Sequence, residues 1–148
     1  MRNNMRKEMF DHEINILRDT YRRLLRRNAK INLIKLTTKT HPADLAAVFR
    51  HFSDEEQIEI FSLMKESEHT AEFLSELDDA LVNELLEEES YERIAAIIEK
   101  ASSNDQSGIL NILSTEKAKS IIELLNDDEQ EEIAEIMGYP DDSAGALM

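Results

Sequence analysis

The feature that most constrains this chain is a hidden repeat of about 24 residues. One pattern of apolar positions, at i, i+3, i+4 and i+7, occurs four times, and each copy marks one face of an amphipathic helix. The four copies begin at Leu45, Thr70, Ile94 and Ala118. Near-constant spacing of this kind is typical of proteins built from repeated structural units. The sequence therefore predicts four copies of one helical unit.

Each copy of the pattern is followed at once by a residue that can cap a new helix: Ser53, Asp78, Ser102 or Asn126. Such side chains accept hydrogen bonds from the free N–H groups of a first helical turn. Glu56 and Glu129 extend two of these caps to capping boxes or close variants. A second apolar set then begins at Ile60, Leu85, Ile109 and Ile133. Each unit is thus two helices of roughly ten residues, which are too short to be stable alone in water.

We therefore predict an all-α fold, a right- or left-handed superhelix of about four short helical hairpins preceded by a longer N-terminal helix. That first helix spans roughly residues 5–27, and a short connecting helix runs through Ile31 and Leu36. Gly138 and Pro140 are expected to end the last helix. The predicted organisation is a basic N-terminal helix and connector at 1–40, an acidic repeat body at 41–138 and an exit segment at 139–148. We interpret Met148 as a cut within a longer protein.

Charge is distributed unevenly along the sequence. Residues 1–40 hold 11 Lys and Arg against 4 Asp and Glu, whereas residues 41–148 hold 6 against 28. The acidic body repels phosphate backbones, so we expect no nucleic-acid binding, and cations or basic surfaces are its natural partners. There is no cysteine, which excludes disulfides and thiolate-held metals. No apolar run approaches the ~20 residues that a membrane span needs.

Nothing in the sequence indicates an enzyme. The four histidines have no metal-ligand spacing, the three glycines are isolated, and no EF-hand loop is present. Acidic clusters such as 87–89, 127–129 and 141–142 are either solvated helix ends or a loose divalent-cation surface. The basic run at 21–27 is either one basic face of a helix near the acidic repeats or a contact with anionic lipid headgroups.

Three segments resemble the cytosolic N-terminal domain of MgtE-type magnesium transporters. The run Thr40-His41-Pro42-Ala43-Asp44-Leu45-Ala46 is similar to the family's entry into its repeats, and Ala71–Leu77 is similar to its second unit. The most specific match is Tyr139-Pro140-Asp141-Asp142-Ser143-Ala144-Gly145-Ala146-Leu147-Met148, which resembles the family's exit toward a paired CBS domain. The resemblance covers about residues 30–148.

The resemblance implies a regulatory role that depends on low-affinity Mg²⁺ shared between domains. The ligands carried over by position are Glu72, Asn104, Asp105 and the carbonyl of Ala146. Asn104 is uncharged, and Gly108 stands where the family can carry an acidic residue, which implies a weaker or rearranged site. Docking on the CBS pair would then close the pore of the transmembrane domain in the same polypeptide.

The resemblance further implies a location at the cytoplasmic face of the bacterial inner membrane, a homodimer in the full-length protein, and membrane association only through the transmembrane part. Two alternatives remain open. The same module can form a soluble sensor with a CBS pair, or a scaffold for protein–protein interaction similar to flagellar-switch repeats.

Overall fold

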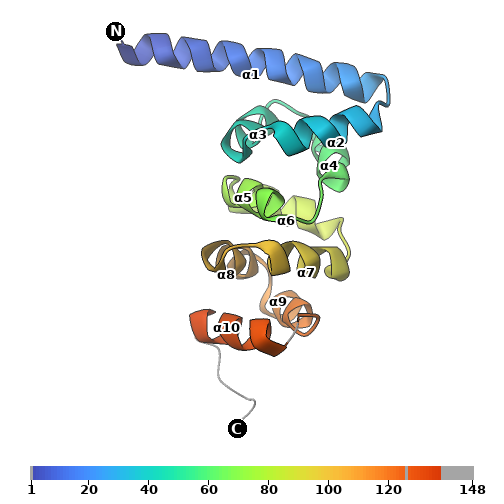
Figure 1. The fold of residues 1–148 in the computed structure, drawn as a ribbon, viewed down its shortest axis with the longest axis vertical. Helices are drawn as coiled ribbons and strands as arrows, with labels where there is room; N and C mark the ends of the chain where they lie inside the picture. The colour runs from blue at the N-terminus through green and yellow to red at the C-terminus, as the bar shows by residue number, and fades with distance from the viewer. Residues whose placement is uncertain (1, 126, 138–148) are drawn as a thin grey trace. The chain divides into compact units, whose positions relative to one another are not determined.

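The computed structural model describes residues 2–125 and 127–137, with side chains described for 9–125 and 130–135. This part of the chain is all-helical, with ten helices and no strand (Figure 1). The chain divides into two compact units, Met1–Lys65 and Glu66–Met148. Unit 1 holds α1 (Arg2–Arg26), α2 (Lys30–Lys39), α3 (Pro42–Phe49) and α4 (Asp54–Leu63). Unit 2 holds α5 (Glu68–Ser75), α6 (Asp79–Glu87), α7 (Tyr91–Lys100), α8 (Ser103–Ile112), α9 (Thr115–Ile122) and α10 (Asp127–Met137).

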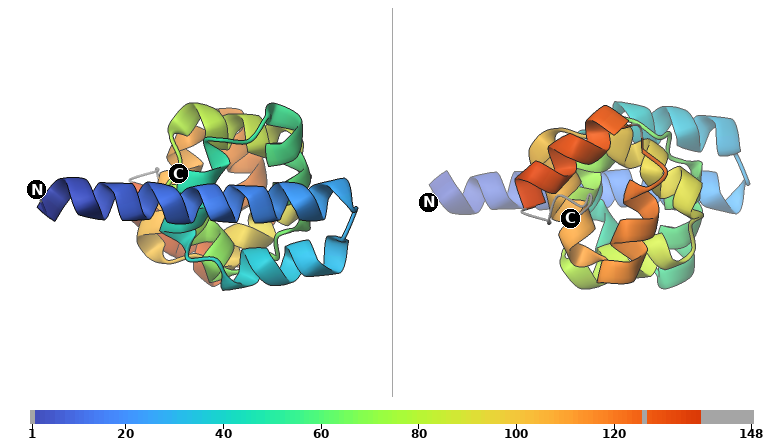
Figure 2. Two further views of the ribbon diagram at one scale, coloured as in Figure 1. Left: turned by 90° about the horizontal axis from the view of Figure 1, so that it is seen from above. Right: turned by 90° about the horizontal axis from the view of Figure 1, so that it is seen from below.

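Unit 1 consists of two packed layers, α1–α2 and the predicted hairpin α3–α4. Helix α1 contacts α2 and α3, and α2 contacts α4. Tyr21 of α1 is fully buried, and its ring meets Phe52 edge-on with centroids 5.7 Å apart. The N-terminal end of α1 projects past α2 and α3 (Figures 1 and 2), and Phe10 in this part of the helix is exposed. Helix α1 ends at Arg26, and two residues later the chain turns at Asn28, whose φ of 53° is tolerated by asparagine.

Unit 2 is a stack of the three remaining predicted hairpins, α5–α6, α7–α8 and α9–α10. Helix α7 packs between α5 and α9, and α8 packs between α6 and α10. The buried residues are largely aliphatic, and all of those named here except Val82 belong to the predicted apolar sets: Phe73, Leu74, Val82, Leu85, Leu86, Ile94, Ile97, Ile98, Ile109, Leu110, Ile121 and Ile133. The predicted all-α repeat of short hairpins is therefore confirmed.

Helix caps explain where the helices of each hairpin begin. Ser53, Asp78 and Ser102 cap the second helices as predicted, and Ser53 forms a full capping box with Glu56. Asn126, Gly138 and Pro140 lie outside the described residues. The sequence analysis missed a matching set of caps on the first helices, where side chains of His41, Ser67, Ser90 and Ser114 accept backbone N–H groups.

A repeated glutamine ties the two helices of a hairpin together. Gln57 and Gln106 are buried, and the Nε2 of each donates a hydrogen bond of 2.8 Å to a carbonyl of the preceding helix, Phe49 O or Ile98 O. Gln130 donates instead to the loop that follows α9, with its Nε2 at 2.7 Å from Leu125 O. All three stand four residues after a predicted cap, and the second repeat carries Val82 there. Because buried polar groups need partners, this pairing fixes how the second helix leaves the first.

The residues of the predicted exit segment lie outside the described part of the chain. The division at residues 1–40, 41–138 and 139–148 therefore stays a prediction. The boundary between the two compact units falls elsewhere in the sequence, between Lys65 and Glu66.

Candidate functional site

The packing of α5 against α8 brings three of the four predicted ligands onto neighbouring helices. Glu72 lies on the exposed face of α5, opposite the buried side chains of Ala71 and Phe73. Asn104 and Asp105 lie in the first turn of α8, where Asn104 is exposed and Asp105 is half-buried. Acidic residues are stabilised in a first helical turn by the helix dipole. The carbonyl of Ala146 lies outside the described residues.

The position of Gly108 is open to a larger side chain. It follows Asn104 by four residues and Asp105 by three, so all three share one face of α8. Gly108 is exposed, and a Cβ added there meets nothing within 4 Å. Packing therefore does not require glycine at this position.

The surface of unit 2 is dominated by carboxylates. In its described part, all acidic side chains except Glu89 and Asp105 are exposed, whereas the exposed basic residues are Lys100 and Lys119. Arg93 is engaged with Glu89 at 2.9 Å and Glu66 at 3.6 Å. Among the side chains that the structure describes, Glu72 and Asp105 take part in no ion pair, and no three His, Asp or Glu form a group able to hold a metal.

The basic end of α1 contributes one residue to packing and leaves its neighbours exposed. Arg22 Nη2 donates a 2.6 Å hydrogen bond to His51 O, and Nε lies 3.5 Å from Glu56. Its guanidinium also lies 6.0 Å from the centre of the Phe52 ring. Arg22 thus anchors α1 on the α3–α4 hairpin. The sequence analysis did not separate Arg22 from the exposed Arg23, Arg26 and Arg27, because burial of an arginine depends on the partner helix.

These observations define an acidic helical-repeat domain of stacked hairpins. Residues 40–142 match the family described as MgtE intracellular N domain, and the chain belongs to this family. A solved structure described as "Crystal structure of the soluble part of a magnesium transporter" has a similar fold, with a TM-score of 0.73 at 14% sequence identity. That match covers 87% of this chain and 51% of the other, so this chain spans about half the length of that structure. A search of curated proteins found no match.

The identification confirms the family predicted from the entry, second-unit and exit motifs. Within the described residues, no helix is both long enough and apolar enough to cross a bilayer. The assignment of Glu72, Asn104, Asp105 and Ala146 as metal ligands stays a prediction.

Proposed function

We propose that this chain is the cytosolic regulatory domain of a magnesium transporter, in which bound Mg²⁺ docks the acidic repeats on a CBS pair and thereby closes the pore. The match of residues 40–142 to the MgtE intracellular N domain family supports this function most directly. The excess of exposed carboxylates on unit 2 supports a response to divalent cations. The family description names a domain and no reaction, and we propose regulation rather than catalysis.

The physical basis of the proposal is electrostatic repulsion between acidic surfaces. Two carboxylates about 6 Å apart repel each other by roughly 0.7 kcal/mol in water, and by more when they are partly buried. Several such pairs across a domain interface approach the ~5.5 kcal/mol that moves a two-state equilibrium from 1:99 to 99:1. Mg²⁺ bound between the surfaces removes the repulsion and favours the docked state.

The ligands that we propose on this chain are Glu72, Asn104, Asp105 and the carbonyl of Ala146, with the remaining ligands on other domains. Mg²⁺ prefers oxygen ligands, keeps several waters, and is often held by only one or two carboxylates. The exposed carboxylate of Glu72 and the half-buried one of Asp105 lie on packed helices and suit this role. Because Asn104 is neutral and Gly108 has no side chain, we propose a low affinity.

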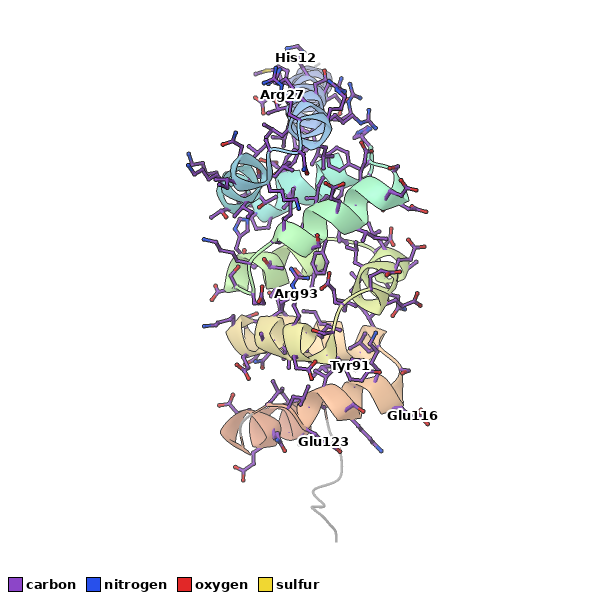
Figure 3. The ribbon with its side chains drawn as sticks, turned by 90° about the vertical axis from the view of Figure 1, so that its right-hand side faces the viewer. His12, Arg27, Tyr91, Arg93, Glu116 and Glu123 are labelled. Carbon is purple, nitrogen blue, oxygen red and sulfur yellow. The ribbon has the colours of Figure 1, made fainter. Side chains whose placement is uncertain are left out.

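The test measures compaction of a longer cytosolic fragment that includes the segment after residue 148. Small-angle scattering with increasing Mg²⁺ should show a decrease in the radius of gyration. The double variant Glu72→Gln/Asp105→Asn should need more Mg²⁺ for the same decrease, and Gly108→Glu should need less. The control Glu116→Gln/Glu123→Gln removes equal charge from α9 and its C-cap residue, and Glu116 projects from the helix in Figure 3. A radius that does not change with Mg²⁺ would rule out the proposed mechanism.

The parent gene decides between this function and its alternatives. A CBS pair followed by apolar spans indicates a transporter, which we propose is a homodimer at the cytoplasmic face of the bacterial inner membrane. A CBS pair without spans indicates a soluble sensor. A parent gene that encodes no CBS pair and no apolar spans indicates a scaffold protein.

A further inference from the structure

Unit 1 carries a concentration of positive charge that is unusual for a chain with a net charge of −15. Residues 20–43 contain seven Lys and Arg and no Asp or Glu. Arg22 is used in packing, but six others are exposed: Arg23, Arg26, Arg27, Lys30, Lys35 and Lys39. Among the ion pairs of the described residues, none involves any of these six. They lie on the last turns of α1, on the α1–α2 turn and on α2.

Exposed apolar side chains occur on the same two helices. Ile31 is 71% exposed and directly follows Lys30 at the start of α2. On α1, Met9 is 62% exposed and Ile16 is 54% exposed. In the described part of unit 1, all large exposed apolar residues therefore lie on α1 or α2. We call Arg23, Arg26, Arg27, Lys30 and Ile31 the basic turn surface, and Figure 3 looks toward the end of unit 1 on which it lies.

We propose that the basic turn surface binds the headgroups of an anionic membrane leaflet. Basic residues near such a surface are attracted by its negative potential, and an isolated apolar side chain gains by entering the headgroup region. The centre of a protein interface is apolar, closely packed and depleted of charged residues, whereas this surface holds four cations around a single isoleucine. A lone isoleucine among arginines and lysine fits a fluid layer of lipids better than it fits a protein partner.

The acidic residues of unit 1 do not prevent this contact. In α4, which packs against α2, Asp54, Glu55 and Glu59 are exposed. In α1, the exposed Asp11 and Glu13 lie more than two turns before Arg23, and Asp19 is paired with Arg18 at 3.1 Å. A helix is about 10 Å in diameter, while the Debye length at physiological ionic strength is about 8 Å. Repulsion between the lipid surface and charges one helix away is therefore largely screened, whereas attraction to the basic turn surface acts at contact. This surface provides a second membrane contact, beyond the transmembrane part expected from the family resemblance.

The test is sedimentation of the 148-residue chain with two kinds of vesicle, pure phosphatidylcholine and phosphatidylcholine mixed with phosphatidylglycerol. We expect binding to the anionic vesicles alone, and we expect this binding to weaken as salt is added. The variant Arg26→Gln/Arg27→Gln/Lys30→Gln should lower the partition coefficient roughly 100-fold, since each basic residue contributes a factor of about five. Ile31→Ser should lower it by a smaller factor.

The matched control is Arg50→Gln/Lys100→Gln/Lys119→Gln, which removes the same charge from exposed positions elsewhere. This variant should bind anionic vesicles nearly as well as the parent chain, and circular dichroism should show that both triple variants stay helical. Equal loss of binding in both variants would overturn the proposal, because net charge would then explain the effect. The proposal would also be overturned if the parent chain does not bind anionic vesicles. It would be overturned as well if analytical ultracentrifugation shows that the chain self-associates through its basic turn surface.

Discussion

The first layer of unit 1, α1–α2, packs on the next layer in the same pattern as the hairpins of unit 2, but its sequence is different. In unit 1, α1 contacts α3 and α2 contacts α4, just as α7 contacts α9 and α8 contacts α10 in unit 2. The first layer lacks the features of the repeat: its leading helix has 25 residues, and no side-chain cap precedes α2. Its main buried residue is the aromatic Tyr21, whereas unit 2 relies mainly on Ile and Leu.

This difference shows which parts of the repeat sequence packing requires. An apolar stripe that faces the next layer is enough to hold a helix pair in place. Caps, helix length and surface charge are then free to vary in a terminal layer, which contacts a neighbour on one side only. In unit 1 this freedom coincides with the basic surface, while the repeats of unit 2 remain acidic.

The largest expected effect contrasts a buried phenylalanine of the repeats with an exposed one of the first layer. Phe73 is fully buried in α5, and Phe73→Ala should lower the free energy of unfolding by about 3–5 kcal/mol through lost burial and a cavity. Phe10 is exposed on the projecting part of α1, so Phe10→Ala should lower the free energy of unfolding by less than about 1 kcal/mol. Urea denaturation followed by circular dichroism measures both. Equal losses would contradict the distinction between the two regions.

The repeated glutamine offers a test within the repeats. Gln106→Val introduces the residue that the second repeat already has at Val82, and it removes the hydrogen bond to Ile98 O. That carbonyl keeps the N–H of Ala101 as a donor, so we expect a loss of about 1–2 kcal/mol rather than the full penalty of an orphaned group. Thermal unfolding measures the loss. If Gln106→Val is neutral, the glutamine does not determine the hairpin geometry.

Tyr21 gives the first layer a dependence on alkaline pH. Burial raises the pKa of the Tyr21 phenol well above its ordinary value, and the phenol forms a 3.0 Å hydrogen bond with Thr40 Oγ1. Its contribution to stability is fully present below pH ~10, the pKa of an unfolded tyrosine, and is lost as pH rises further, at up to about 1.4 kcal/mol per pH unit.

Tyr21→Phe removes the phenol and with it this pH dependence. At neutral pH it should cost about 1 kcal/mol, because one hydrogen bond is lost while Thr40 still donates to Leu36 O. Above pH ~10 its stability should fall less steeply than that of the parent chain. Urea midpoints measured at several pH values compare the two, and parallel curves would contradict the assigned pKa direction.

The smallest effect concerns Gly108, in the interior of α8. Gly108→Ala should raise the free energy of unfolding by about 0.5–1 kcal/mol, because glycine is a poor helix former and the added methyl group meets nothing. Differential scanning calorimetry measures the rise. A decrease would show that the glycine is needed for packing, and would weaken the interpretation of this position as a vacant acidic site.

Sequence reasoning predicted the periodic features well. The stripes beginning at Leu45, Thr70, Ile94 and Ala118 became α3, α5, α7 and α9, and Ser53, Asp78 and Ser102 cap the helices that follow. Local signals of this kind depend only on nearby residues. The caps Ser67, Ser90 and Ser114 depend equally on nearby residues. They could have been predicted in the same way, but the prediction considered only the caps that follow each apolar stripe.

Features that depend on distant contacts could not be predicted in this way. The role of Arg22 follows from His51 and Glu56, about 30 residues away, and the hydrogen bonds of Gln57 and Gln106 follow from the path of a hairpin. The proposed metal ligands came from family resemblance. The structure brings the helices of Glu72 and Asp105 together, but a site shared with another domain leaves no complete pattern in one chain.

The layered packing of unit 2 has a consequence for how such domains change length during evolution. Helices of one hairpin pack mainly on those of the hairpins next to it. Duplication or deletion of one whole hairpin therefore creates junctions of a kind already present, with no new interior to design. Related domains can therefore differ in length by one or more whole hairpins. A partner bound at one end of the stack is then displaced by the thickness of one hairpin, while the surface that it recognises is unchanged.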